Sequence, residues 1–273
     1  MSPEIDSAGD ADGLTSGGER FREIVRALAV AVLLAGVGIA VGGVLVLAAV
    51  VLLGVSGIEI TPLLSIVLSL VLATGLGFGG VALGYLRYRG RGLDYVGVAV
   101  PSLRQVAFVI GGYVAAMGFL IVASVIISTT GAEAAPNTAA EIGTRNPEIL
   151  LLLVPASLLL IGPGEELLYR GVVQNRLGEA LPAPAAIVLA SLIFASIHYF
   201  SLAGAPRARL VSISVLVLPT LVFGTVYELT DNIVVPALIH GFYNATLFSL
   251  LYVTLQFAGS EQFPQALVAV GVF

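Results

Sequence analysis

The sequence predicts an all-α membrane protein, a polytopic bundle of seven transmembrane helices. The chain is 58% hydrophobic, has a mean hydropathy of +1.04 and carries only 11% charged residues. A soluble domain has about a quarter of its residues charged, so this chain has too little polar surface to face water on all sides. Its apolar residues also gather in runs of bilayer length, without the alternation that a transmembrane β-barrel needs.

The amino-terminal tail, residues 1–19, is rich in Ser, Gly, Asp and Glu. Such a stretch cannot bury enough apolar surface to offset its chain entropy, so it is predicted to be disordered. It does not resemble a signal peptide, because its leading residues are acidic and the apolar run behind it is too long.

Seven apolar runs follow, and a bilayer span takes about 20 residues. The five runs that reach this length on their own are Ala27–Leu53, Leu63–Leu86, Val106–Thr129, Leu210–Tyr227 and Ile233–Phe257. The two shorter runs are Ile149–Ile161, which ends at Gly162-Pro163-Gly164, and Ala185–Ile197, which runs into His198. Both span only if their polar ends enter the membrane. In the carboxy-terminal tail, residues 258–273, the run Ala266–Phe273 is too short for a secure eighth helix.

Glycines recur at four-residue spacing in the first two runs, at positions 38 and 42, 75 and 79, and 80 and 84. This spacing favours close helix approach in lipid. The general abundance of glycine in transmembrane helices explains the pattern equally well.

Arginine placement predicts the orientation, since basic residues concentrate on the cytoplasmic side. Arginines precede the first run, separate the second from the third and follow the fourth; they are Arg20, Arg22, Arg26, Arg87, Arg89, Arg91, Arg104, Arg170 and Arg176. The loops on the other side, around Glu59 and over residues 131–148, hold only Arg145. The amino terminus is therefore expected in the cytoplasm of a multi-pass protein of the cell membrane, although Arg207 and Arg209 fit the rule poorly.

Three groups of polar residues lie in the apolar second half, where a charge at the bilayer centre costs roughly 2.5–3.5 kcal/mol. In the first group, Pro163 suits the first turn of a new helix, which would place Glu165 and Glu166 near its positive end. Glu166 and Arg170 are four residues apart and can pair. Glu165 is left over as a base. An interfacial helix end is the plain structural alternative.

The second group is Phe194 with His198, and the third is His240 with Asn244, one helical turn apart. If the chain reverses near residues 181–184, Glu165 and His198 come to similar heights and can meet. His240 falls on the order of 10 Å away in depth from His198 unless a helix is tilted, broken or lengthened. A hydrogen bond that joins two helices accounts for the third group as readily as a catalytic role does.

In order and spacing, the three groups resemble the signature of the CPBP family of intramembrane proteases. This family includes the CAAX prenyl endopeptidases and the bacteriocin-processing or Abi proteins. Its pattern is Glu-Glu-x-x-x-Arg, then Phe-x-x-x-His, then His-x-x-x-Asn. The matching residues are Glu165, Glu166 and Arg170, then Phe194 and His198, then His240 and Asn244. The resemblance covers about residues 147–250.

The resemblance implies hydrolysis of a peptide bond within the membrane, by a four-helix catalytic core over residues 147–257. Glu165 would act as the base on a water with help from His198, and His240 and Asn244 would stabilise the oxyanion. Glu166 and Arg170 would hold the helix geometry. Residues 20–130, the first three helices, match nothing in the signature. The expected partners are membrane lipid and a peptide or protein substrate, with no nucleic acid.

Two alternatives remain open. Zinc held by Glu165, His198 and His240 would give a metalloprotease, because two imidazoles and a carboxylate form a catalytic zinc set. The sequence lacks His-Glu-x-x-His and Asn244 is an indifferent zinc ligand, so no cofactor is favoured. The other alternative is non-enzymatic, a proton-coupled carrier or a scaffold. The chain has no cysteine, which excludes thiolate nucleophiles and Cys-ligated metal sites.

Overall fold

The computed structural model describes residues 9–257 and the side chains from Gly17 onward, and this part of the chain is helical without a β-strand. Seven helices in it are long and apolar enough to cross a membrane, as the sequence predicted. Their bounds are Gly17–Val55, Pro62–Tyr88, Leu103–Thr130, Pro147–Gly178, Ala183–Phe200, Pro206–Thr230 and Val234–Phe257. They comprise α1 (Gly9–Val55), α2 (Pro62–Leu68) with α3 (Val81–Tyr88), α4 (Leu103–Thr130), α6 (Pro147–Ala156) with α7 (Gly162–Glu166) and α8 (Asn175–Gly178), α9 (Ala183–Ile197), α10 (Pro206–Thr230) and α11 (Val234–Phe257).

The structure describes part of the predicted amino-terminal tail and none of the predicted carboxy-terminal tail. Residues 1–8 and the whole run 258–273, with the candidate eighth helix, lie outside the described residues. Helix α1 begins at Gly9, so the backbone of residues 9–19 is helical where the sequence predicted disorder. Extending an existing helix adds one hydrogen bond for each residue fixed, so a long apolar helix can carry a polar extension.

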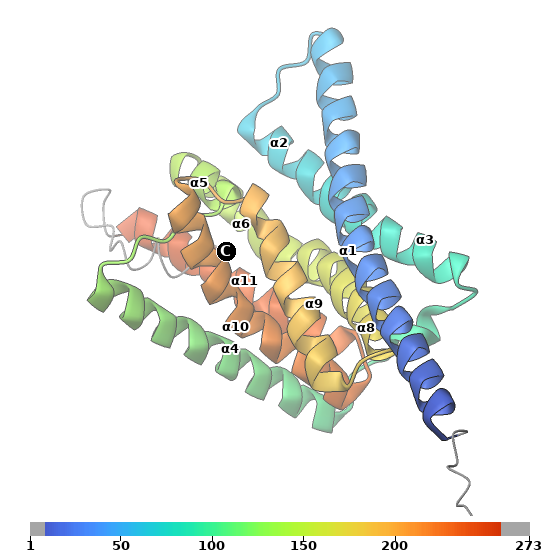
Figure 1. Cartoon of the computed structure of the whole chain (residues 1–273). Coiled ribbons are helices and arrows are strands. Elements are labelled where there is room, and N and C mark those ends of the chain that lie inside the picture. Colours follow the sequence, from blue (N-terminus) through green and yellow to red (C-terminus); the bar gives the residue numbers. More distant parts are fainter. Residues whose placement is uncertain (1–8, 258–273) are drawn as a thin grey trace, which may run out of the picture.

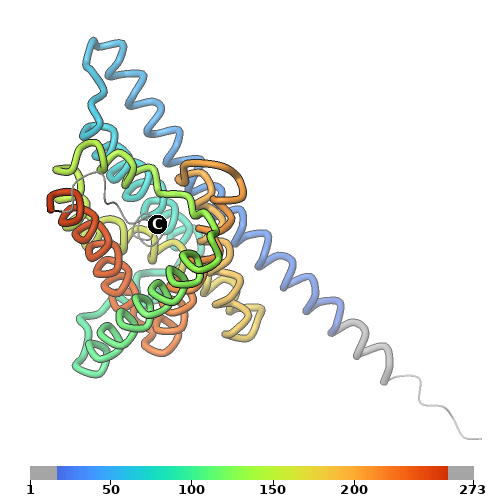
Figure 2. The backbone as a smooth tube through the Cα atoms, turned by 90° about the vertical axis from the view of Figure 1, so that its left-hand side faces the viewer, coloured from blue at the N-terminus to red at the C-terminus, as the bar shows by residue number. Residues whose placement is uncertain are grey.

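The first two spans cross each other and lie against the remaining helices (Figures 1 and 2). A Cβ on Gly42 would lie 2.8 Å from the Cα of Ala73, and one on Gly77 would lie 2.8 Å from the Cα of Gly42. The predicted close approach is therefore present at Gly42. A Cβ on Gly80 or Gly84 would have no heavy atom within 4 Å, so the four-residue spacing alone did not identify which glycines form the contact.

The fourth span does not end at Gly162-Pro163-Gly164, and the prediction of a new helix beginning at Pro163 was wrong. The span continues through a π-helical segment, Ser157–Ile161, which ends two residues before Pro163. Proline lacks the N–H that an α-helical turn requires, and a wider turn before it accommodates the ring without ending the helix. Gly162 is needed for packing, since a Cβ there would lie 2.5 Å from the carbonyl oxygen of Ala237 on α11.

One end of the bundle, here called the amino-terminal face, is formed by residues 89–102, 179–182 and 231–233. Hydrogen bonds join these segments to each other and to the helix ends. The Asn232 side-chain amide donates to the carbonyl of Ala99, and the Arg89 guanidinium pairs with Glu179 at 3.2 Å. Burial and a hydrogen bond to Glu179 raise the pKa of Tyr95, so its phenol remains a donor to that carboxylate.

The other end, here called the opposite face, is formed by residues 56–61, 131–146 and 201–205, with the short helix α5 (Thr138–Arg145). The Thr138 amide donates to the carbonyl of Ser201, and the Ser212 hydroxyl donates to the carbonyl of Ala135. Arg170 belongs to neither face. The sequence placed it after the fourth span, but it lies within that span and is fully buried.

Candidate active site

Glu165 and Glu166 are both buried on α7, and their side chains face different surroundings. Glu165 lines a cavity inside the bundle and is 8% exposed. Glu166 is fully buried and forms the predicted ion pair with Arg170, with 3.2 Å between Oε2 and Nε. Adjacent residues on a helix point about 100° apart, which separates a carboxylate facing the cavity from one facing the protein interior. α7 lies between two π-helical segments, Ser157–Ile161 and Leu167–Gln174.

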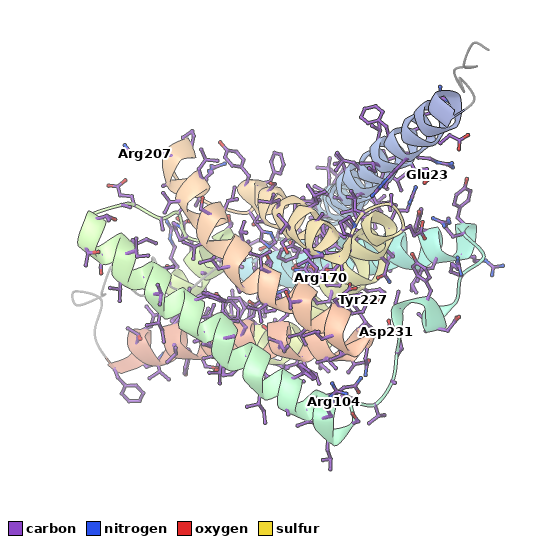
Figure 3. All side chains as sticks on the ribbon, turned by 60° about the horizontal axis from the view of Figure 1, so that its bottom comes forward. Glu23, Arg104, Arg170, Arg207, Tyr227 and Asp231 are labelled. Atoms are coloured by element: carbon purple, nitrogen blue, oxygen red, sulfur yellow. The ribbon has the colours of Figure 1, made fainter. Side chains whose placement is uncertain are left out.

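Glu166 also binds the imidazole of His240, at 2.9 Å between Oε1 and Nδ1. This contact was not predicted. Arg170 completes the set: its Nη2 donates to the carbonyl of Thr220 at 3.2 Å, and its guanidinium lies over the ring of Phe194, 5.2 Å from the centroid. Figure 3 shows Arg170 in the middle of the bundle, among the helices. The carboxylate of Glu166 thus links the fourth, sixth and seventh spans through two partners.

Phe194 stands between the two histidines. Its ring centroid is 4.7 Å from that of His198 and 5.9 Å from that of His240, and Tyr169 meets it edge-on at 4.9 Å. Phe223 on α10 stacks on His240 at 5.0 Å with an interplanar angle of 20°. Because aromatic rings pack on both sides, the His240 imidazole has little freedom to rotate.

His198 and His240 both pack against the ring of Phe194 and line the same cavity. The count from the sequence treated the whole stretch 201–209 as a loop and put the two histidines on the order of 10 Å apart in depth unless a helix was tilted, broken or lengthened. In the structure α10 already begins at Pro206, so the helix before α11 is longer than the count assumed. This lengthened helix is one of the deviations that allow the two histidines to share a site.

His198 has a defined tautomer. Its Nδ1 lies 2.9 Å from the carbonyl oxygen of Phe194, and since a carbonyl only accepts, Nδ1 carries the proton. In the neutral ring Nε2 is then an acceptor. His198 lines the same cavity as Glu165, so the predicted approach of these two residues is confirmed at the level of a shared cavity.

The cavity has a volume of about 380 Å³, within the range of ligand pockets. Besides Glu165 and His198 it is lined by His240 and Asn244, which share a face of α11 as predicted. The Nε2 of His240 lies 3.9 Å from Oε2 of Glu165. Asn244 makes no hydrogen bond with any described residue, so its amide is available to a bound molecule.

The zinc alternative requires three donors to converge. Among the described residues, no three His, Asp or Glu side chains lie close enough together to hold a metal ion. The Nδ1 of His240 lies against Glu166 and the Nδ1 of His198 against the Phe194 carbonyl, which leaves Nε2 as the remaining ring nitrogen of each. Glu165, His198 and His240 line one cavity without forming such a group.

Sequence reasoning missed two residues at the site. Tyr243 lines the cavity, is 1% exposed, and its hydroxyl has no hydrogen-bond partner among the described residues. Its position three residues after His240 places it on the same face of α11, a signal that was present in the sequence. Phe223 carried no signal, because nothing in an apolar run marks which phenylalanine meets a histidine on another helix.

Residues 147–246 match the family model of type II CAAX prenyl endopeptidases, described as Rce1-like. The matched segment contains all three groups of polar residues and supports the family that the sequence predicted. The family indicates a protease. Neither the curated proteins nor the solved structures gave a match to this chain.

Proposed function

Starting from the match of residues 147–246 to the Rce1-like family model of CAAX prenyl endopeptidases, we propose that this chain is an intramembrane endopeptidase that hydrolyses a peptide bond of a membrane-associated protein or peptide. The observation that carries the proposal is the convergence of Glu165, His198 and His240 on one buried cavity. A carboxylate and two imidazoles held inside apolar helices are costly to place there, so such groups commonly mark a site of function.

In the first step Glu165 acts as the general base. Its carboxylate takes a proton from a water molecule, and the water oxygen attacks the carbonyl carbon of the substrate. The Nε2 of neutral His198, an acceptor because Nδ1–H donates to the Phe194 carbonyl, holds the other hydrogen of the water. Such a positioned base contributes typically 10²–10⁴-fold.

In the second step the oxyanion that forms on the substrate carbonyl is held by hydrogen-bond donors. Asn244 supplies its amide, and His240 donates through Nε2 when its ring carries both protons. Glu166 fixes the Nδ1 side of that ring, which turns Nε2 toward the cavity. One such donor is worth about 10²–10³ in rate. The C–N bond then breaks, the amine leaves with the proton from Glu165, and the other product is a carboxylic acid.

The test compares the wild type with Glu165→Gln and His198→Ala in detergent or liposomes, on a pool of quenched fluorescent peptides. Glu148→Gln is the matched control, an exposed carboxylate at the start of the same helical span. We expect at least a 10²-fold loss for the first two variants and no change for the control. Equal cleavage by all four proteins would sink the proposal. Background cleavage by all four would favour the carrier or scaffold instead.

Elemental analysis of the active protein separates the glutamate mechanism from a zinc-dependent one. The proposal expects no stoichiometric metal and full activity in the presence of chelators. Stoichiometric zinc, with activity lost to a chelator and restored by the metal, would replace the glutamate mechanism.

A further inference from the structure

A second hollow of the molecule lies on the outside of the bundle, along the seam between α4 and α10 (Figures 1 and 3). It is a groove with a volume of about 690 Å³, and among the described residues none lines both this groove and the candidate active-site cavity. Its lining is apolar apart from Arg104 and Thr225. The groove is therefore a separate feature, which the proposed hydrolysis does not use.

Small side chains on α4 create this groove. Ala107, Gly111 and Ala115 are four residues apart, so they lie on one side of the helix, and all three are exposed. A Cβ on Gly111 would have no heavy atom within 4 Å, whereas a Cβ on Gly112 would lie 2.5 Å from Cδ1 of Ile239. Gly111 therefore leaves open space in the groove, while Gly112 permits close packing of α4 on α11.

The length of the groove matches one leaflet of a bilayer. From Ala107 to Phe119, both of which line the groove, α4 rises about 18 Å. One leaflet contributes about 15 Å, half of the hydrocarbon thickness. The groove begins near the start of the span Leu103–Thr130 and stops near its middle. It thus covers the depth that one acyl chain occupies, from the headgroup level to the bilayer centre.

Arg104 stands at the headgroup end of the groove, in the first turn of α4. Its guanidinium lies over the ring of Phe108, 5.8 Å from the centroid, and has no hydrogen-bond or ion-pair partner among the described residues. The acidic residues near the end of α10, Glu228 and Asp231, do not line the groove. A guanidinium presents paired N–H donors that match the oxygens of a phosphate, so this end of the groove is complementary to a lipid headgroup.

We propose that the groove binds one phospholipid, with the phosphate at Arg104 and one acyl chain between α4 and α10. A helix from a second copy of this chain is the competing occupant, because small residues four apart also favour helix contacts. A helix packed along the groove would cover the Arg104 charge, and burying a charge without a partner is costly. A phospholipid supplies the apolar chain and the anionic partner in one molecule.

The position of the groove connects its occupant with the candidate active site. Leu221 and Val222 line the groove, and the next residue on α10 is Phe223, whose ring stacks on His240. The bound lipid therefore contacts the back of the helix that orients this imidazole.

Native mass spectrometry tests the proposal on the full chain, purified in detergent and titrated with phosphatidylglycerol. Diacylglycerol with the same acyl chains is the matched probe without a phosphate. We expect one phosphatidylglycerol to bind per chain, and diacylglycerol to bind at least about tenfold more weakly, because it cannot form the charge-assisted hydrogen bond. Equal affinity for the two lipids would overturn the assignment of the phosphate to Arg104.

Three variants of α4 test the place of the acyl chain. Gly111→Leu and Ala115→Leu put a large side chain into the groove from two positions. Gly118→Leu is the control, since a Cβ there would also have no heavy atom within 4 Å but Gly118 does not line the groove. We expect both groove-filling variants to bind phosphatidylglycerol at least about tenfold more weakly than the wild type, and the control to bind it unchanged. Unchanged binding by either groove-filling variant that remains folded in SDS titration would overturn the proposal.

Two arginine variants test the headgroup end. Arg104→Gln should bind phosphatidylglycerol at least about tenfold more weakly and leave diacylglycerol binding unchanged. Arg91→Gln is the control, because Arg91 also lies over an aromatic ring, 5.2 Å from the centroid of Tyr95, but does not line the groove. Equal loss in both variants would show a general effect of surface charge and refute the site.

The same spectra report the oligomeric state. Wild-type dimers that Gly111→Leu dissociates would assign the groove to a second copy of the chain and overturn the lipid proposal. None of these measurements requires cleavage, so their outcome is independent of the proposed function.

Discussion

Replacing Arg170 by methionine removes the cationic partner of a fully buried carboxylate. Two unit charges 3.2 Å apart attract by about 5 kcal/mol at an effective dielectric constant of 20. Deleting one member of a buried pair costs about 3–5 kcal/mol, because the other charge remains without compensation. Glu166 keeps His240 as a second partner, so we expect Arg170→Met to fall at the lower end, near 3 kcal/mol.

The chain supplies a matched control in Glu141 and Arg145, a pair with the same four-residue spacing. Its side chains are 43% and 78% exposed, and exposed pairs of this kind contribute about 0.3–0.5 kcal/mol. A double-mutant cycle with Glu166→Gln and Arg170→Met should give a coupling energy of about 2–3 kcal/mol. The equivalent cycle with Glu141→Gln and Arg145→Met should stay below about 0.5 kcal/mol.

The free energy of unfolding is measured by SDS titration in mixed micelles. The transition is followed by far-ultraviolet circular dichroism, because the chain has no tryptophan. Similar coupling energies for the two pairs would refute the reasoning, since they would mean that Glu166 and Arg170 are as solvated as the surface pair. Restored stability in the double variant without restored cleavage would separate the structural role of Glu166 from its contact with His240.

Three further changes test other contacts. Gly42→Leu should destabilise the protein by about 1–3 kcal/mol or prevent folding, because it overpacks the crossing with the second span, whereas Gly36→Leu, with open space around it, should be neutral in the same SDS titration. Asn232→Leu removes an amide that bonds two loop segments of the amino-terminal face and should cost about 1–3 kcal/mol, measured by SDS titration and by faster proteolysis there. Phe223→Leu removes the ring stacked on His240 and should lower kcat more than it raises KM, with stability reduced by less than about 1.5 kcal/mol.

Each of these expectations has a result that would contradict it. A stable, active Gly42→Leu protein would mean that the first two spans do not cross at this glycine. Unchanged proteolysis of Asn232→Leu would show that the loops are held by other contacts. An unchanged kcat in Phe223→Leu would mean that His240 is oriented without the stacked ring.

Hydropathy predicted the seven spans well because a bilayer admits few backbone solutions, and an apolar run of sufficient length has to be a helix. The pair of Glu166 and Arg170 followed from spacing alone, since residues four apart on a helix are neighbours. What failed depended on local deviations from an ideal helix. A count from the sequence assumes that every helical residue rises 1.5 Å and that each helix begins where its apolar run begins. The π-helical segment before Pro163 breaks the first assumption, and the early start of α10 at Pro206 breaks the second.

Contacts between helices were the least predictable part of the site. The prediction for His240 used only its spacing from Asn244 on the same helix. Its hydrogen bond to Glu166 depends on how the spans pack against each other, and no residue spacing in a single sequence encodes that packing. The roles of Glu165, His198, His240 and Asn244 remain proposals that the activity measurements above address. The cavity adds the geometry that those roles need, in that all four side chains line it.

The ion pair between Glu166 and Arg170 lies within one helix, and this has a consequence for how the protein enters the membrane. A ribosome adds roughly 5–20 residues per second, so His240, 74 residues after Glu166, is made several seconds later. During that interval the fourth span must leave the translocon without its later partner. An isolated carboxylate or guanidinium at mid-membrane would oppose that transfer by roughly 2.5–3.5 kcal/mol each. Because these two charges sit one turn apart, they can neutralise each other before any other catalytic span has been synthesised. Insertion of this pair and assembly of the active site thereby become separate events in time.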